Sequence, residues 1–297
     1  MKINKVLIDD AACEAFRMKL ARLLVTAHDH YWLDEAVRTA TGLATSIIAC
    51  DVEAGLEIIT DSTPDGRPGA YLLFFGRTID GLGKSLLTRI GQGLMTCPTT
   101  AVFNAMQGGE ALDVGRKLAY FGDGFEEPKT LWERRMWSIP VTEGEFLVEE
   151  SFNVGDGVAG GAFIVMAESL ESALTAVTRA RDAINPLPGV ILPFPGGSAR
   201  CASKVGSEKY PFLKASTNTR FCPTLRGRVE SKVPEGVTTA LEVVIDGVDV
   251  ESVKTAMRAG IHAACEVNGV KMITAASFGG KLGGMEIVLR ELFNQPY

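Results

Sequence analysis

The sequence predicts a mixed α+β protein in which helices cover one face of largely antiparallel sheets. Three observations carry this prediction. Some segments repeat their apolar residues with helical spacing, and others are short β-branched or aromatic runs of strand length. The two patterns alternate as strand–helix–strand units in both halves of the chain. Extra closely spaced strands near the middle and the end indicate antiparallel pairing.

The first half is expected to begin with a short strand, KINKVLI, centred on residues 6–8. Between residues 11 and 27 apolar positions recur every three or four residues, which predicts an amphipathic helix. Residues 31–40 continue as helix until Gly42 ends it. The remaining elements expected in this half are strand 45–50 (TSIIAC), turn 61–69 with Arg67 at its tip, strand 71–76 (YLLFFG), helix 82–95, and strands 117–122 (KLAYFG) and 134–141 (RRMWSIPV).

The second half is expected to hold two further helices, at 169–184 with Ser169 as its N-cap and at 250–266. The strands expected around them are 145–151, 162–168, 190–194, 238–247, 271–277 and 285–292, with a glycine-rich FGGKLGG segment at 278–284. The repeated pattern suggests two lobes, 1–143 and 144–297, each a ferredoxin-like split β-α-β sandwich.

Composition excludes several classes of protein. No apolar run reaches the ~18–20 residues needed to cross a bilayer, and the N-terminus has no signal-peptide core, so we expect a cytoplasmic protein without a membrane partner. A net charge of −6 disfavours nucleic acid as the main partner. The six cysteines form no C-x-x-C pair, which favours reduced thiols over disulfides or zinc. His28 and His30 form an isolated H-x-H pair, and no metal site is expected.

Two nucleotide-binding motifs are rejected on their context. Residues 155–160 match G-x-G-x-x-G, but the segment that follows reads as a strand, whereas the motif must open a helix. A glycine turn or a close backbone approach explains it better. Residues 83–85 resemble the end of a P-loop, yet Thr78 stands where that loop requires glycine.

Positive charge concentrates in the Gly-, Ser- and Pro-rich segment 193–232. This segment holds eight basic side chains against Glu208 and Glu230, a net charge of +6 in an acidic chain. Such a run is either a solvated loop or a site where ammonium groups and backbone N–H groups bind an anion. Composition alone leaves both readings open.

Several blocks together resemble one family, formylmethanofuran–tetrahydromethanopterin formyltransferase, over nearly the whole chain. The blocks are T-P-D-G-R-P-G (63–69), A-Y-F-G-D-G (119–124), V-A-G-G-x-F (158–163), P-F-P-G-G (193–197), A-S-K-V-G-S (202–207), A-S-T-N (215–218) and F-G-G-K-L-G (278–283). The Arg-rich stretches LWERRMW and TLRGRVESK and the tail NQPY favour the bacterial branch of the family over the archaeal one.

The resemblance implies two α/β lobes, no metal and no tightly bound cofactor. It implies two C1-carrier coenzymes as substrates, of the methanofuran and tetrahydromethanopterin types, whose polyanionic tails would account for the basic segment. It also implies a homotetramer, or in bacteria one subunit of a formyltransferase/hydrolase complex. The direction of the reaction in the cell stays open.

The implied chemistry moves a formyl group from one amine nitrogen to another. The pterin N5 is neutral at pH 7 and needs no activated side chain, but the departing amine must receive a proton. Glu242 is the family-matched position for this general acid. In a strand it shares a face with Ala240 and Val244, and burial there would favour its protonated form. Without the resemblance, a strand Glu would be interpreted as solvent-facing.

Substrate contacts are expected at glycines where backbone can approach a coenzyme and at polar groups of the basic segment. The residues are Gly160, Gly161, Gly196, Gly197, Ser203, Lys204, Ser216, Thr217 and Asn218. Arg67 is a further candidate, which either faces substrate or braces its turn.

Two other functions remain open beside the enzyme. The chain could be a non-catalytic structural subunit that kept the fold inside a formyltransferase/hydrolase complex, or a generic small-molecule binding protein. The retained coenzyme-loop blocks favour the enzyme, because a scaffold has no need of them.

Overall fold

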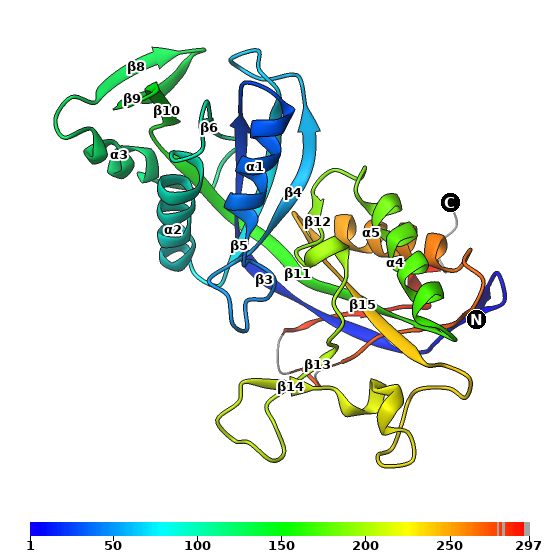
Figure 1. The fold of residues 1–297 in the computed structure, drawn as a ribbon. Coiled ribbons are helices and arrows are strands. Elements are labelled where there is room, and N and C mark those ends of the chain that lie inside the picture. The colour runs from blue at the N-terminus through cyan, green and yellow to red at the C-terminus, as the bar shows by residue number, and fades with distance from the viewer. Residues whose placement is uncertain (278, 281–282, 294–297) are drawn as a thin grey trace. The chain divides into compact units, whose positions relative to one another are not determined.

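The structure, a computed structural model, describes residues 1–277, 279–280 and 283–293 (Figure 1). Residue contacts divide the chain into unit 1, which is Met1–Arg17 with Val158–Tyr297, and unit 2, which is Met18–Gly157. Both boundaries fall inside long strands, β3 (Ala12–Thr26) and β11 (Phe152–Ala167). The lobe boundary expected between residues 143 and 144 lies at the turn that joins β9 to β10 within unit 2.

Unit 2 is built on an antiparallel sheet with the strand order β4-β5-β3-β6. Helix α1 connects β3 to β4, and α2 connects β5 to β6. The bounds are α1 His30–Thr41, β4 Glu53–Thr60, β5 Gly69–Gly76, α2 Ile79–Thr88 and β6 Ala101–Asn104. Leu33 of α1, Leu82 of α2 and Phe74 of β5 are fully buried in one apolar cluster, so both helices cover the same core.

The rest of unit 2 extends this sheet. Strand β10 runs parallel to β6 and pairs with β9, which pairs with β8, while β7 pairs with the first residues of β11. These elements are the π-helix Arg89–Leu94, β7 Glu110–Leu112, α3 Val114–Ala119, the 3₁₀ turn Tyr120–Gly122, β8 Glu127–Leu131, β9 Arg134–Val141 and β10 Gly144–Glu149.

Unit 1 repeats the arrangement of unit 2 with the strand order β12-β15-β11-β16, in which all neighbours are antiparallel. Helix α4 follows β11 and leads to β12, and α5 leads from β15 to β16. The bounds are α4 Leu170–Ile184, β12 Val190–Ile191, β15 Thr239–Gly247, α5 Val250–Ala264 and β16 Val270–Thr274. In each unit, therefore, the first and third strands are the central pair.

The remaining elements of unit 1 lie at the ends of this sheet or outside it. Strand β2 is parallel to β16 and pairs with β1, and β17 pairs with the first residues of β3. The bounds are β1 Lys2–Ile3, β2 Val6–Ile8, β13 Ser203–Val205, β14 Ala215–Thr217, β17 Met285–Val288, and the 3₁₀ turns Pro195–Gly197, Thr219–Phe221, Pro223–Leu225 and Glu291–Phe293.

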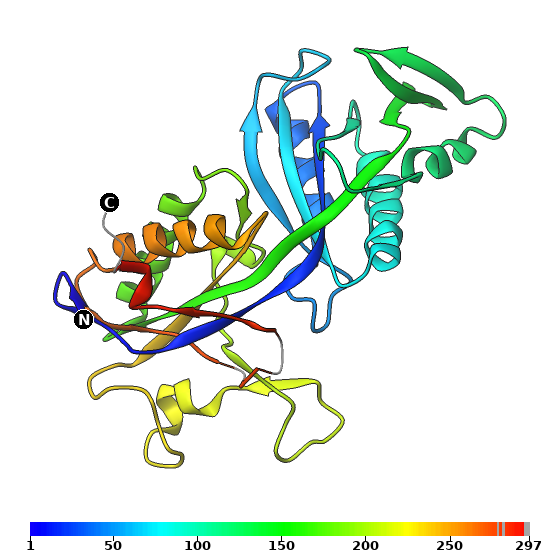
Figure 2. The ribbon, with the colours of Figure 1, turned by 180° about the vertical axis from the view of Figure 1, so that it is seen from behind.

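The two faces of the unit 1 sheet are covered by different elements. Helices α4 and α5 lie on one face, and the segment with β13 and β14 lies on the other (Figures 1 and 2). Ala176 of α4 and Met257 of α5 share a core with Val243 of β15. On the opposite face Phe221 and Val233 pack with Ile164 of β11 in a separate cluster. The long connection between β12 and β15 thus covers the face that the helices leave open.

Several expected elements are confirmed at nearly the expected bounds. They are the helices at 31–40, 82–95, 169–184 and 250–266, and the strands at 71–76, 134–141, 145–151, 238–247 and 271–277. Ser169 is the N-cap of α4, and its side chain accepts the N–H of Ser172. Helix 82–95 ends as a π-helix. Of the expected FGGKLGG segment, Phe278, Lys281 and Leu282 lie outside the described residues.

The expected helix at 11–27 is wrong, because this segment is strand β3. It lies between β5 and β6, and its residues pack into apolar clusters on both faces of the sheet, so Leu23, Leu24 and Val25 are all buried in succession. A strand buried on both faces has no alternation that distinguishes it from a buried helix.

Two expected strands are also wrong. Residues 45–50 form turns in which Cys50 N–H bonds the Ser46 carbonyl and Ile47 N–H bonds the Glu53 carboxylate, so the backbone is satisfied locally. Residues 117–122 form the end of α3 and a 3₁₀ turn. Tyr120 and Phe121 are exposed there, so their aromatic character does not reflect a buried strand.

None of the helices in the described residues has the length and apolar character that a membrane span requires.

Candidate active site

Glu242 lies in the middle of β15, on the sheet face opposite α4 and α5. Its neighbours Leu241 and Val243 belong to the core beneath those helices, and side chains alternate along a strand. Glu242 is directly opposite Ile164 of β11, which in turn is opposite Thr274 of β16. Ile164 belongs to the apolar cluster on that face. The carboxyl therefore lies in a cross-strand row of side chains whose nearest member on β11, Ile164, is apolar.

This setting changes the protonation of Glu242. The residue is partly buried, and the loss of hydration raises the pKa of its carboxyl from the ordinary 4.5 to about 7. A carboxylic acid of this pKa retains its proton in an appreciable fraction of molecules at neutral pH. It can donate that proton to a basic leaving group and recover it afterwards.

The loop that follows β12 is attached to Glu242 through the backbone. Ala199 N–H donates to the Glu242 carbonyl at 2.7 Å, and Glu242 N–H donates to the Ala199 carbonyl at 2.9 Å. Just before this pair, Gly196 and Gly197 have φ angles of 65° and 81° in the 3₁₀ turn. A Cβ on Gly197 would lie 3.0–3.2 Å from Leu192 and Arg181, whereas one on Gly196 would meet open space. Gly196 thus offers exposed backbone next to the strand pair.

Most of the expected polar contacts meet in one small hairpin. Strands β13 and β14 pair Ser203 with Thr217 and Lys204 with Ser216, and Asn218 N–H donates to the Ala202 carbonyl at 2.9 Å. Ala202 packs against the apolar cluster on the face that carries Glu242. The five residue steps from Ala199 to Lys204 span at most about 18 Å. The hairpin is thus tethered within about 18 Å of the residue that pairs with Glu242.

The hairpin is cationic at its exposed end. Lys204 forms an ion pair with Glu208, whose side chain is 88% exposed, and this pair lowers the pKa of the Glu208 carboxyl. Lys209 and Lys214 are exposed, and Lys209 lies over the ring of Tyr210. Exposed surface ion pairs bind weakly. An anionic ligand can therefore replace Glu208 as the partner of Lys204.

Gly160 and Gly161 lie in a β-bulge of β11, where the register with β15 shifts. Gly160 has φ 83°, and its N–H donates to the Asp246 carboxylate at 3.1 Å. A Cβ there would lie 2.6 Å from the Phe16 ring, and one on Gly161 would lie 2.2 Å from Val253 of α5. Packing alone requires both glycines, so their expected contact with substrate stays a prediction.

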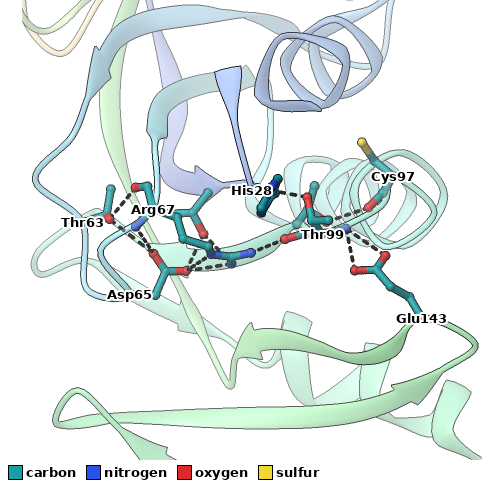
Figure 3. A network of polar contacts seen from close by, with 9 residues as sticks. His28, Thr63, Asp65, Arg67, Cys97, Thr99 and Glu143 are labelled. Atoms are coloured by element: carbon teal, nitrogen blue, oxygen red, sulfur yellow. Dashed lines mark hydrogen bonds and ion pairs between the residues drawn. The ribbon is translucent and has the colours of Figure 1, made fainter. Parts of the chain in front are cut away.

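Arg67 lies in unit 2, in the turn between β4 and β5, and its guanidinium is extensively bonded (Figure 3). It donates to Asp65 at 2.7 and 2.9 Å, to the Thr26 hydroxyl at 2.9 Å and to the Thr99 carbonyl. Burial of Asp65 opposes its ionisation, but hydrogen bonds from the Thr26 hydroxyl and the Arg67 guanidinium keep the pKa of this carboxyl below its usual range. These bonds fit the bracing role, and substrate contact by Arg67 stays a prediction.

Sequence reasoning missed two buried carboxylates in unit 1. Asp246 is fully buried and supports the Gly160 bulge, although the pattern I-D-G was interpreted only as the end of a strand. Glu14 of β3 is also buried and accepts bonds from the Ser277 hydroxyl at 2.7 Å and the Gly280 N–H at 2.8 Å. The one local signal for each was an acidic residue among apolar neighbours, and for Glu14 the expected helix at 11–27 hid it.

The sheet face that carries Glu242 also borders a cavity, whereas the described part of the chain holds no cluster of ligands for a metal. A cavity of about 600 Å³ is lined by residues 9–12, 231–234 and parts of 272–277, including Lys232 and Met272. Met272 belongs to the cluster that packs on the Glu242 face. No three His, Cys, Asp or Glu side chains of the described residues are grouped closely enough to hold a metal ion.

A carboxylic acid that holds its proton near neutral pH, beside a cationic hairpin, is typical of an enzyme site in which a general acid protonates a leaving group. Two family models together match most of the chain. Residues 1–141 match the formylmethanofuran-tetrahydromethanopterin formyltransferase model, and residues 144–292 match the model of its proximal lobe. The chain belongs to the formylmethanofuran–tetrahydromethanopterin formyltransferase family.

Curated relatives and solved structures agree with this assignment. Formyltransferases from Methanopyrus kandleri and Methylobacillus flagellatus are 50% and 46% identical and cover 99% and 98% of this chain, with 100% and 99% of their own lengths matched. The formyltransferase structure from Methanosarcina barkeri has a TM-score of 0.94 at 46% identity, covering 99% of this chain and 100% of its own. The formyltransferase/hydrolase complex from Methylorubrum extorquens with methylofuran also reaches 0.94, at 39% identity, covering 100% of this chain and 99% of the matched one.

Proposed function

We propose that the chain moves a formyl group reversibly between formylmethanofuran, or a methylofuran-type carrier, and N5 of tetrahydromethanopterin, with Glu242 as general acid. Family membership supports the reaction, and one observation supports the role of Glu242. Its carboxyl, set in an apolar row, has a pKa of about 7. At neutral pH a carboxyl with this pKa is protonated in an appreciable fraction of molecules, and a donor to a departing amine must be protonated.

The proposed reaction needs no side-chain nucleophile. N5 attacks the formamide carbon, a C–N bond forms, and the carbonyl electrons move to oxygen to give a tetrahedral oxyanion. Glu242 donates its proton to the furan carrier's nitrogen, the second C–N bond breaks, and the neutral amine leaves. The resulting carboxylate accepts the proton that N5 loses, so the acid is regenerated and the reaction stays reversible.

The cationic hairpin supplies the second part of the proposal. Lys204, Ser203 and Ser216 bind the anionic tail of a carrier, while Gly196 and Gly197 let backbone approach it. The two backbone hydrogen bonds between Ala199 and Glu242 support this division, because they fix the start of the hairpin segment to the strand that carries the acid. Binding the tail at a distance holds the formamide close to the acid without itself contributing to bond making.

Each unit is proposed to be a ferredoxin-like split β-α-β sandwich. The orders β4-β5-β3-β6 and β12-β15-β11-β16 support this, since in both the first and third of four strands lie at the centre. The matched ranges 1–141 and 144–292 support lobes that divide at residue 143. A cytoplasmic location, a homotetramer and the lack of a tightly bound cofactor stay predictions.

The enzyme hypothesis and the hypothesis of a non-catalytic subunit predict different behaviour of the purified chain. The test is formyl exchange between formylmethanofuran and tetrahydromethanopterin, followed with the chain alone and again with hydrolase-type subunits added. Exchange by the chain alone supports the enzyme. Carrier binding without exchange in either assay would favour the structural subunit of a formyltransferase/hydrolase complex, the assembly named for one structural neighbour.

A further inference from the structure

Residues 218–238, which we call the strap, lie on the face of the unit 1 sheet that α4 and α5 leave open (Figure 1). The strap is tied to the rest of unit 1 at both ends. Asn218 N–H donates to the Ala202 carbonyl at 2.9 Å, and Thr238 N–H donates to the Ala167 carbonyl at 3.0 Å. One end is therefore fixed to the β13–β14 hairpin and the other to β11, the strand next to the one that carries Glu242.

The strap is also bonded to itself. Lys232 N–H donates to the Arg220 carbonyl at 2.8 Å, and the Arg226 guanidinium donates to the Val237 carbonyl at 2.9 Å. Arg220 also forms an ion pair with Glu230 at 2.9 Å, but both side chains are exposed, and exposed pairs contribute little. Backbone bonds and buried apolar side chains are thus what hold the strap in place.

The apolar side of the strap faces the sheet. Phe221 and Val233 are 5% and 6% exposed and pack in one cluster with Ile164 of β11. Phe221 is the sole aromatic side chain of this cluster in the described part of the chain. Ile164 is the residue directly opposite Glu242. The ring of Phe221 therefore packs against the strand neighbour of the carboxyl.

A polar cavity borders the same cluster. The cavity of about 600 Å³ is lined by Asp9, Asp10 and Lys232 among others, and a space of this size with polar walls holds water. Met272 lines the cavity and also packs in the cluster with Phe221. The apolar cluster thus lies next to water and includes the strand partner of Glu242.

Glu242 owes its raised pKa to burial and not to a neighbouring charge. Cys13 of β3 senses the Glu242 carboxylate, but burial is the main cause that raises the pKa of this thiol to about 11, so it stays neutral where Glu242 titrates. The other charged groups on the elements around Glu242, apart from the Arg220–Glu230 pair, are Glu14, Asp246, Arg200, Lys204 and Lys232.

We propose that the strap excludes water from the Glu242 carboxyl and that Phe221 is the positioning residue of this cover, acting through Ile164 and not touching substrate. Water admitted by a breach in the cover would solvate the carboxylate and favour loss of the proton. The consequence for catalysis rests on the proposed role of Glu242 as general acid. The cover itself rests only on the packing of unit 1.

Infrared spectroscopy of the full chain tests the cover without any substrate. The C=O band of the protonated Glu242 carboxyl is identified by its absence from Glu242→Gln, and in the unaltered chain we expect it to titrate at about pH 7. In Phe221→Ala the midpoint should be about one pH unit lower, because water reaches the carboxyl. Phe221→Leu keeps an apolar side chain and should restore the midpoint to within about 0.3 pH unit.

Three further variants keep the test sharp. Val233→Ala opens the cover at a second residue of the strap, and should lower the midpoint by about half a pH unit even if Phe221→Ala does not fold. Phe163→Leu, at the buried residue next to Ile164 on the helix-covered face, is the control for lost packing and should leave the midpoint unchanged. Lys232→Met, which removes the ammonium 6.0 Å from the Phe221 ring, should also leave it unchanged.

Formyl exchange provides a second readout that a general structural defect would not reproduce. With the midpoint one unit lower, kcat of Phe221→Ala should fall about tenfold at about pH 8 but less than about twofold at about pH 5. The KM values should stay unchanged. A defect in folding alone lowers kcat by the same factor at every pH.

The inference is overturned if the infrared midpoint is the same in Phe221→Ala and Val233→Ala as in the unaltered chain. It is equally overturned if Phe163→Leu or Lys232→Met moves the midpoint as far as Phe221→Ala does, because general packing or charge would then be the cause. A shifted infrared midpoint without a matching change in the pH profile of kcat would contradict Glu242 as the general acid and leave the cover standing.

Discussion

Ala199 and Glu242 exchange two backbone hydrogen bonds, at 2.7 and 2.9 Å, so the basic segment is anchored on the residue that carries the proposed acid. This pairing links the segment proposed to bind a carrier to the residue proposed to donate the proton. The strand partner on the other side of Glu242 is the apolar Ile164. The acid is thus fixed by backbone on both sides while its carboxyl remains on an apolar face.

Replacing Glu242 by Gln is expected to lower kcat for formyl exchange by about 10²–10⁴-fold, because the amide cannot protonate the leaving amine. The KM values should change little, since the shape of the side chain is kept. Steady-state kinetics in both directions provide the measurement. Glu286→Gln, at an exposed position of β17, is the matched control. Near-normal turnover of the Glu242 variant would remove it as the general acid.

The pH dependence of the reaction should report the same group. Because the pKa of Glu242 is raised to about 7, the protonated acid is lost as the pH rises through that value. We expect kcat to fall above about pH 7, approaching a tenfold decrease for each pH unit, and the residual activity of Glu242→Gln to lack this step. A profile for the unaltered chain that is flat from about pH 6 to 9 contradicts the assignment.

The contribution of Glu242 to the free energy of unfolding should fall as the pH rises, whereas that of an ion-paired carboxylate rises. In the unfolded chain Glu242 ionises near 4.5, whereas in the folded protein it keeps its proton until about 7. Its contribution is therefore complete below about pH 4.5 and is lost as the pH rises to about 7, by about 3 kcal/mol in total. Urea unfolding at about pH 5 and pH 8, compared with Glu242→Gln, isolates this difference. Equal pH dependence in both proteins would contradict it.

Gly160→Ala should destabilise unit 1 strongly. The new methyl group would need φ 83° and would lie 2.6 Å from the Phe16 ring and 3.0 Å from the Glu14 carbonyl. We expect a loss of about 3 kcal/mol or more from backbone strain and overpacking together. Gly206→Ala provides the control, because its φ is 72° but nothing lies within 4 Å, so about 1 kcal/mol is expected. Similar losses in denaturant unfolding for both would show that packing around Gly160 is unimportant.

Lys204→Ala should raise the KM for a glutamylated furan carrier about fivefold and leave kcat unchanged, with the effect weaker at high salt. Glu208→Gln removes the competing partner of Lys204 and should lower the same KM. Lys271→Ala, an exposed lysine of β16 that pairs with Glu168, is the control for a general loss of charge. An unchanged KM for both Lys204→Ala and Glu208→Gln would place the carrier tail elsewhere.

Much of the architecture can be predicted from local patterns. Ser169 caps α4 as its sequence position indicates, and the aromatic run at 71–76 is strand β5. The segment 11–27 could not be assigned in this way. Its burial on both faces arises from pairing with β5 and β6, which lie far along the chain, and this hides the period that separates strand from helix.

In the candidate site, too, some features could be predicted from local sequence and others depend on residues distant in the chain. The charge of segment 193–232 is visible in composition, and the hairpin brings Ser203, Lys204 and Ser216 together. The glycines at 160 and 161 are expected to let backbone approach a coenzyme, which stays a prediction. The structure shows that Phe16 and Val253 also pack closely against them. Asp246, which supports the bulge, had no local signal beyond an acidic residue at the end of a strand.

The sequence by itself determined the family, the mixed α+β class, most helices and the location of the positive charge. These depend on local spacing, capping groups and composition, which are properties of neighbouring residues. Only the tertiary structure decided that Glu242 faces an apolar row, that Ala199 anchors the basic segment to it, and that Phe221 packs on the same face. Burial, raised pKa values and cavities arise from residues distant in the chain, and no local pattern records them.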